Sequence, residues 1–158
     1  MLLAAAERLP DFRFILMGQT LPGPPDYMQT LARLAKLPNV LMTGHLKEPH
    51  SRDILWQCDL MIIPIPMDDL GIYGCPNRLW TFMATGRPIV STPMPEVAKF
   101  GNLVYLGDGI EEIVAALRAA AQERDRARIL ARLEVAKKHV WPMLAEKMWS
   151  VMLMDPAA

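Results

Sequence analysis

The chain has 158 residues, of which 52% are hydrophobic, and its 17 basic and 17 acidic residues give a formal net charge of zero. This length and composition suit one globular domain with a single core, and the charge balance argues against a nucleic-acid-binding module, which usually carries a basic excess. Cys58 and Cys75 cannot build a disulfide framework, and no apolar run approaches the roughly 20 residues that span a bilayer. We therefore expect a reducing, cytoplasmic setting.

Apolar runs that end at Gly or Pro punctuate the first two thirds of the chain. Such runs predict buried strands of a parallel sheet. They cover residues 12–18, 39–44 and 59–66, and two shorter runs cover 88–92 and 102–106. Helical signals separate the strands, with Asp26 as the expected cap of a helix over 27–36. Further helices are predicted over 48–57, over 76–85 and, from residue 111 onward, in a closing series whose last member covers 141–153.

Strand–helix alternation with short connections predicts an α/β fold, a Rossmann-like parallel sheet with helices on both faces. We expect one domain over 1–158, with its core over about 3–122 and closing helices over about 123–154. In such sheets ligands bind outside the carboxyl ends of the strands. The candidate functional loops therefore follow Gly18, Gly44, Pro64 and Thr92.

Several familiar catalytic and cofactor motifs are absent from these loops. The segments "MGQTLPG", "TGHLKEP" and "PIPMDDLG" match neither the G-x-G-x-x-G dinucleotide fingerprint nor a P-loop. Ser91 has no G-x-S-x-G context, and the three histidines show no metal-ligand spacing. Only His45 directly follows a Gly at a predicted strand end, so a ligand-facing role and a surface role both stay open for it.

The segment around Pro76 and Arg78 carries the clearest chemical signal. Pro76 suits the first turn of a helix, where free backbone amides and the helix dipole favour an anion. Arg78 lies in the same predicted turn and has two interpretations. It contacts a phosphate through its guanidinium, or it is a solvated side chain or a surface partner of Asp68 or Asp69.

Residues 118–138 mix basic and acidic side chains. We expect this stretch to form a solvated helix face. Its members are Arg118, Arg124, Arg126, Arg128, Arg132, Lys137 and Lys138, with Glu123, Asp125 and Glu134 between them.

Four segments together resemble a known family. They are "LPDFRFILMG", "LPNVLMTGHL", "LWQCDLMIIPIP" and "CPNRLWTFMATGRPIVSTPMPEV". The chain is similar, from about residue 3 to about residue 153, to the carboxyl-terminal half of GT-B glycosyltransferases of the group 1 type, which use nucleotide-activated sugars with retention. The most specific element is the pattern P-x-[KR]-x-x-x-[FY]-x-A-x-G-[RK]-P-[IV]-V, which begins at Pro76.

The resemblance implies that this part of the fold binds the donor, a UDP- or GDP-type nucleoside-diphosphate sugar, without a metal. It places the nucleobase by the residues after the second strand, the sugar beside 73–75, and the diphosphate at 76–78, where its charge is neutralised. The positions implied at the donor are Gly18, His45, Leu46, Tyr73, Gly74, Cys75, Pro76, Asn77, Arg78 and Thr81.

Two features depart from the family pattern. Many relatives carry a Glu directed at the donor ribose where this chain has Thr81, and another Glu where it has Tyr73. A hydroxyl accepts hydrogen bonds more weakly than an ionised carboxylate does. The family also opens this domain with a central strand that is absent here, so we expect the strands at 12–17 and 59–64 to pair directly, or a second chain, such as another copy in a homodimer, to cover the gap.

The resemblance implies an enzyme that transfers a hexose-type sugar to a cell-surface polysaccharide or a lipid-linked acceptor, at the membrane surface in its full form. We expect this chain to be inactive without an acceptor-binding domain or chain, because the reaction centre lies between two domains. The alternative is a degenerate, non-catalytic scaffold or nucleotide-sensing module. A sugar-nucleotide epimerase would need a pair of catalytic carboxylates that the sequence does not show.

Overall fold

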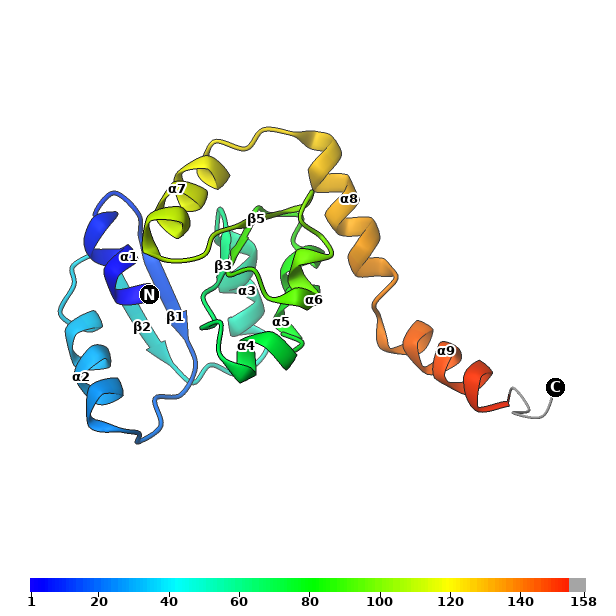
Figure 1. Cartoon of the computed structure of the whole chain (residues 1–158), viewed down its shortest axis with the longest axis horizontal. Helices are drawn as coiled ribbons and strands as arrows, with labels where there is room; N and C mark the ends of the chain where they lie inside the picture. The colour runs from blue at the N-terminus through cyan, green and yellow to red at the C-terminus, as the bar shows by residue number, and fades with distance from the viewer. Residues whose placement is uncertain (154–158) are drawn as a thin grey trace.

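A computed structural model describes residues 1–153 as helices that alternate with short parallel strands (Figure 1). In chain order the elements are α1 (Leu2–Arg8), β1 (Phe14–Met17), α2 (Pro25–Leu34), β2 (Val40–Gly44), α3 (His50–Gln57), β3 (Met61–Ile63), α4 (Asp69–Tyr73), α5 (Arg78–Ala84), β4 (Ile89–Ser91), α6 (Pro95–Ala98), β5 (Val104–Leu106), α7 (Ile110–Ala121), α8 (Arg126–Lys137) and α9 (Trp141–Leu153). The predicted α/β class, with parallel strands flanked by helices, is confirmed.

The strands form two sheets instead of the single sheet that the sequence predicts. β1 pairs with β2, and β3, β4 and β5 form a second sheet in that order; every pair is parallel. Within residues 1–153 β1 and β3 do not pair, so the expectation that they pair directly is wrong. β1 pairs through one edge with β2, and β3 pairs through one edge with β4. The two sheets are joined by packing of side chains, not by backbone hydrogen bonds between β1 and β3.

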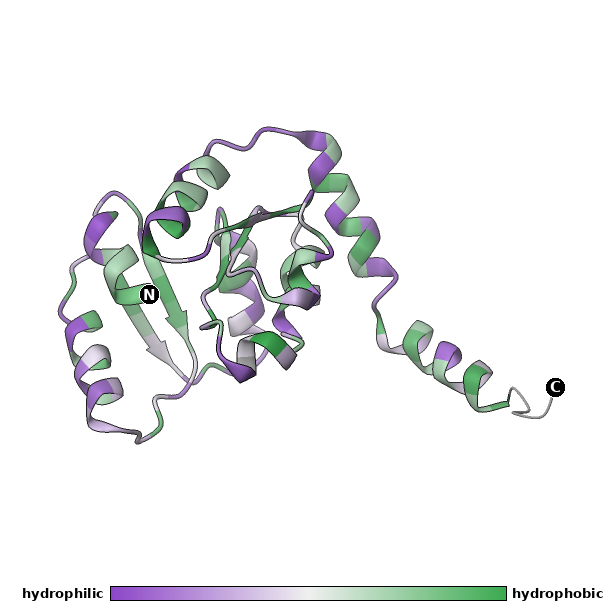
Figure 2. Ribbon diagram, viewed as in Figure 1, coloured by the Kyte–Doolittle hydropathy of each residue, from purple (hydrophilic) through white to green (hydrophobic). Residues whose placement is uncertain are grey.

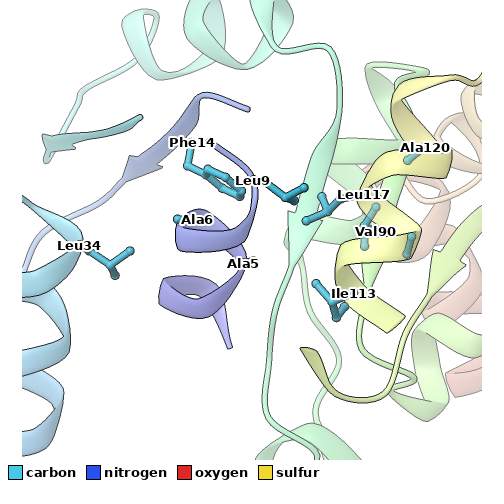
Figure 3. Close-up of a cluster of buried hydrophobic side chains, with 10 residues drawn as sticks. Ala5, Ala6, Leu9, Phe14, Leu34, Val90, Ile113, Leu117 and Ala120 are labelled. Carbon is cyan, nitrogen blue, oxygen red and sulfur yellow. The ribbon is translucent and has the colours of Figure 1, made fainter. Parts of the chain in front are cut away.

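One apolar cluster supplies this packing. Ala5, Ala6 and Leu9 of α1 are at most 1% exposed and share the cluster with Phe14 of β1 and Val90 of β4 (Figure 3). α7 adds further buried side chains, namely Ile113, Ala116, Leu117 and Ala120. Burial of such side chains contributes roughly 1.5–3 kcal/mol for each large residue. The helices α1 and α7 therefore hold the two sheets together from one side.

A second cluster lies on the other side of the three-stranded sheet. Its buried residues come from α3, α5 and α6 and from the strands, and α8 packs against it through partly buried side chains. Leu79 and Met83, four residues apart on α5, are fully buried there, as the helical repeat predicts for one face. This packing orients α5, so that its opposite side remains available to solvent.

The last helix contributes little to either cluster. α9 extends away from the sheets (Figure 1), and none of its described residues is buried. Figure 2 shows several green, hydrophobic segments along α9. Trp141 and Met152 of this helix are 81% and 72% exposed. None of the helices within residues 1–153 combines the length and apolar character needed to cross a membrane.

The beginnings of two helices differ from the sequence prediction. α2 begins at Pro25, not after a cap at Asp26, because proline is tolerated at the first helical position, where its missing N–H would have no partner. α5 begins at Arg78, two residues later than predicted. The loop predicted after β3 also contains a short helix, α4, whose first turn is capped by the Asp68 carboxylate at 3.1 Å from the Gly71 amide.

The prediction of a fully solvated face over 118–138 is wrong at Arg132. This side chain is 0% exposed, and its guanidinium donates to the carbonyl oxygens of Leu103 at 2.8 Å and Gly86 at 3.1 Å. α8 packs alongside α5, which turns Arg132 toward the core. An arginine survives burial because these carbonyls and the Glu123 carboxylate satisfy its donors.

Candidate functional site

Two glycines end the strands of the smaller sheet. Gly18 has φ of +138° and Gly44 has φ of +67°, conformations that residues with side chains rarely adopt. The Gly18 amide donates to the Gly44 carbonyl at 3.0 Å, so the two strand ends are tied together. A Cβ at either glycine would meet nothing within 4 Å. The carboxyl edge of this sheet is therefore open above both positions.

His45 and Leu46 follow this edge directly. His45 is exposed and Leu46 is partly buried. The preceding residue, Thr43, directs its hydroxyl to the Gly44 carbonyl at 3.1 Å, which helps to fix the backbone from which the two residues leave the strand. The imidazole of His45 is therefore exposed beside the strand ends, and its role toward a ligand stays a prediction.

The end of α4 and the segment that follows it present the residues predicted beside the sugar. Tyr73 is 85% exposed and Cys75 is exposed, whereas Gly74 is partly buried. Gly71 within α4 has no room for a side chain, because a Cβ would lie 2.0 Å from the Pro66 carbonyl oxygen. The backbone of α4 therefore lies directly against Pro66, three residues after the end of β3.

The residues predicted at the diphosphate lie at the beginning of α5. Pro76 is buried, and Asn77, Arg78 and Thr81 are exposed. Within residues 1–153 the Arg78 guanidinium forms no ion pair, so its predicted pairing with Asp68 or Asp69 is not observed, and Asp68 instead caps α4. The exposed side chain of Arg78 is compatible both with the solvated interpretation and with the phosphate interpretation. α5 has only seven residues, so its dipole is weak, and the phosphate interpretation depends mainly on the charge of Arg78.

Two buried hydroxyls at the end of β4 are structural. Thr92 donates to the Ile65 carbonyl at 2.6 Å, and Ser91 donates to the carbonyls of Thr92 at 2.9 Å and Ile63 at 3.3 Å. Both side chains are 0% exposed. They fasten the end of β4 to the segment after β3. Ser91 is therefore no nucleophile, as its sequence context indicates.

The structure brings the predicted residues to one edge of the molecule in two groups. Gly18, His45 and Leu46 follow β1 and β2, and the stretch from Tyr73 to Thr81 follows β3; Figure 1 shows β1, β2 and α4 ending at the same lower edge. A hollow of about 340 Å³ lies elsewhere, between β5 and α7 beside Tyr105 and Glu112. The predicted site is thus an open edge.

The arrangement suits binding better than acid–base catalysis. It offers one cation, Arg78, together with exposed backbone at Gly18 and an aromatic ring at Tyr73. The ten predicted positions include no carboxylate. Sequence reasoning missed the Asp68 cap and the Gly71 close approach, although an Asp three residues before a Gly at a loop–helix boundary is a detectable capping signal.

Comparison with known proteins assigns the family. Residues 1–123 match the family described as glycosyl transferases group 1. The chain is also 30% identical over 152 residues to TuaH of Bacillus subtilis (strain 168), whose name provisionally describes it as a teichuronic acid biosynthesis glycosyltransferase. The match covers 91% of this chain but only 37% of the length of that relative. The chain therefore belongs to the glycosyl transferases group 1 family.

Proposed function

We propose that this chain binds the sugar donor of a glycosyltransferase, a nucleoside-diphosphate sugar, and that transfer requires an acceptor-binding domain or chain beside it. The observation that carries the proposal is the family match over residues 1–123, which contains every strand end and every predicted donor residue. The open carboxyl edge supports the proposal, since ligand sites often lie at the interface of two domains. The half of such a site that one domain supplies is exposed in the absence of the other domain.

Arg78 is the central residue of this proposal. Its exposed guanidinium, which has no ion-pair partner in the described part of the chain, is available to two phosphate oxygens at once. The leaving nucleoside diphosphate gains charge as the sugar bond breaks, and a fixed cation stabilises that charge. His45 and Leu46 would border the nucleobase, and Tyr73 the sugar.

The acceptor is proposed from chemistry and from the relative's name. The relative's name refers to teichuronic acid biosynthesis, and we infer from it that the acceptor is a polysaccharide or a lipid-linked sugar. In this proposal the acceptor lies at a membrane surface, where the complete enzyme works as a peripheral protein. Residues 1–153 supply no carboxylate at the predicted donor positions to act as base, and the acceptor-binding part would supply that group.

Calorimetric titration with UDP, GDP and their sugars tests donor binding. Arg78→Ala should weaken binding about ten- to a hundredfold, the loss expected for one charge-assisted contact. Arg126→Ala is the matched control, because Arg126 is an exposed arginine at the first position of α8, outside the predicted donor residues, and its loss should leave affinity unchanged. If none of the nucleotides binds at millimolar concentration, the proposal fails.

A non-catalytic scaffold or nucleotide sensor is the second candidate. Thr81 and Tyr73, which replace carboxylates expected from the family resemblance, favour it. A sensor would bind the nucleotide as well as the nucleotide sugar, because it does not need the sugar for a reaction. Mixing the chain with an acceptor-binding partner and assaying sugar transfer separates the two, since a sensor gives no product in any mixture.

A further inference from the structure

The helix α9 presents an apolar face that is left exposed within residues 1–153. Residues spaced at i, i+3, i+4, i+7, i+8 and i+11 from Trp141 lie on one side of a helix, and none of the residues of α9 is buried. The charged and hydroxyl side chains of α9, at Glu146, Lys147 and Ser150, fall on the opposite side. The residues of the apolar face are Trp141, Leu144, Ala145, Met148, Trp149 and Met152.

This apolar face is large for the surface of a folded domain. Met148 and Trp149, at its centre, are 63% and 62% exposed. A single aromatic side chain such as Trp can bury on the order of 150–250 Å² in a contact. Contiguous apolar patches larger than a few hundred Å² are rare on monomeric soluble proteins and mark interaction sites. The face of α9 is therefore a candidate interaction surface.

The start of α9 is held in place by the body of the domain. His139 precedes α9, and its ring stacks on Trp80 of α5 with the ring centroids 3.8 Å apart and the planes inclined by 6°. Nδ1 of His139 also lies 2.7 Å from the Val135 carbonyl oxygen of α8. Phe100 meets both rings edge-on. An anchored helix loses less conformational freedom on association than a loose segment does.

The shape of the face suits another helix. A hollow of about 320 Å³ on α9 is lined by residues of two successive turns, namely Lys147, Met148, Val151 and Met152. Paired helices interlock when a side chain of one helix enters a hollow formed by four residues of the facing helix. A lipid surface makes no use of such a hollow, so the shape favours a helical partner.

The charges favour a second copy of this chain over a membrane. α9 carries one acidic and one basic residue, whereas helices that lie on membranes are typically rich in Lys and Arg on their polar face. Lys137, at the end of α8, is paired with Glu134 at 2.6 Å. The chain as a whole has a formal net charge of zero, so two copies do not repel each other at long range.

We propose that α9 forms the interface of a homodimer, in which its apolar face packs against the same face of a second copy. In a two-fold dimer each contact occurs twice. The chain exposes 10492 Å², about 2,500 Å² more than the roughly 8,000 Å² expected for a folded monomer of 17.8 kDa. This excess is larger than the about 800 Å² that each partner contributes to an ordinary interface. The dimer does not depend on donor binding.

Light scattering over a range of concentrations tests the proposal on the 158-residue chain. The measured mass should rise toward twice 17.8 kDa as the concentration increases from micromolar to millimolar. Met148→Glu places a charge at the centre of the apolar face and should weaken the dimer about tenfold or more. Ser150→Glu is the matched control, because it adds the same charge on the opposite side of α9 and should leave the dimer unchanged. Both side chains are exposed, so both variants should keep the fold, which circular dichroism checks.

The proposal is overturned if the natural chain stays monomeric at millimolar concentration. It is also overturned if Met148→Glu dimerises as tightly as the natural chain, because another surface would then form the interface. Flotation with vesicles of phosphatidylcholine and phosphatidylglycerol tests the lipid alternative. A chain that is monomeric in solution but floats with the vesicles would assign the face of α9 to a membrane instead.

Discussion

Arg132 donates two hydrogen bonds of 2.6 Å to the two carboxylate oxygens of Glu123. The arginine side chain is 0% exposed and the carboxylate 3% exposed. Arg128 reaches the same carboxylate at 2.9 Å, and the Tyr105 hydroxyl donates to it at 3.0 Å. Glu123 thus sits in the short connection between α7 and α8 and binds α8 to the end of the sheet.

Removing the charge of Glu123 should destabilise the fold strongly. Glu123→Gln leaves the buried Arg132 cation without its counter-charge, and breaking such a pair costs about 3 kcal/mol or more, a large share of an ordinary domain's stability. Urea unfolding measures the loss. Glu134→Gln is the control, because Glu134 pairs with Lys137 on the exposed surface and its removal should have no measurable effect. Equal midpoints for the two variants would contradict the structural role of Glu123.

Acid should weaken the same link. Burial alone would raise the pKa of Glu123, but the hydrogen bonds and charge of Arg132, with help from Tyr105 and Arg128, hold that pKa below its ordinary value of 4.5. A carboxyl whose pKa is lower in the folded state stabilises fully above its unfolded pKa, and the contribution is lost as pH falls through the folded pKa. The free energy of unfolding should therefore drop below pH 4.5 more steeply in the natural chain than in Glu123→Gln. Parallel curves would rule out this contribution.

Apolar runs predicted the strands and the fold class because a strand that is buried on both faces has a continuous run of apolar residues. Arg132 could not be placed in the same way. Its neighbours along α8 are charged, and the groups that receive its hydrogen bonds, at Gly86, Leu103 and Glu123, come from three other segments. Only the packing of α8 on α5 brings them together.

The same limit applies to the sheet and to the site. Sequence reasoning identified the gap left by a central strand and offered two outcomes there. Direct pairing of β1 and β3 is not observed, because the helices α1 and α7 share one apolar cluster with strands of both sheets, and cover by a second chain stays a prediction. The loops after Gly18 and Gly44 could be predicted because the chain turns there with a positive φ, which glycine adopts more easily than other residues do. The roles of His45 and Arg78 stay predictions, since they depend on a ligand.

Proline substitutions in β1 should distinguish the edge that pairs with β2 from the opposite edge. Ile15→Pro removes an amide that points away from β2, whereas Leu16→Pro removes one that points toward it, since Phe14 and Gly18 bond in that direction. We expect Leu16→Pro to lower the melting temperature strongly, by the equivalent of about 3 kcal/mol, and Ile15→Pro to lower it much less. Thermal unfolding by circular dichroism measures both. Equal losses would show that the Ile15 amide already has a partner.

A carboxylate at position 81 should strengthen donor binding. Thr81 is exposed on α5, three residues after Arg78, and so lies on nearly the same side of the helix. In the proposed site it borders the donor ribose, whose hydroxyls donate more strongly to a carboxylate than to a threonine hydroxyl. Thr81→Glu should therefore tighten binding of UDP or GDP about tenfold, equivalent to one charge-assisted hydrogen bond.

The neutral substitution Thr81→Gln controls for size, because it offers a similar reach without the charge. It should tighten binding much less than Thr81→Glu does in the same calorimetric titration. Repulsion between the new carboxylate and the diphosphate would act in the opposite direction, and Arg78, one helical turn away, is placed to offset it. If Thr81→Glu weakens binding and Thr81→Gln does not, the phosphates rather than the ribose lie beside position 81, and the donor must be reoriented along α5.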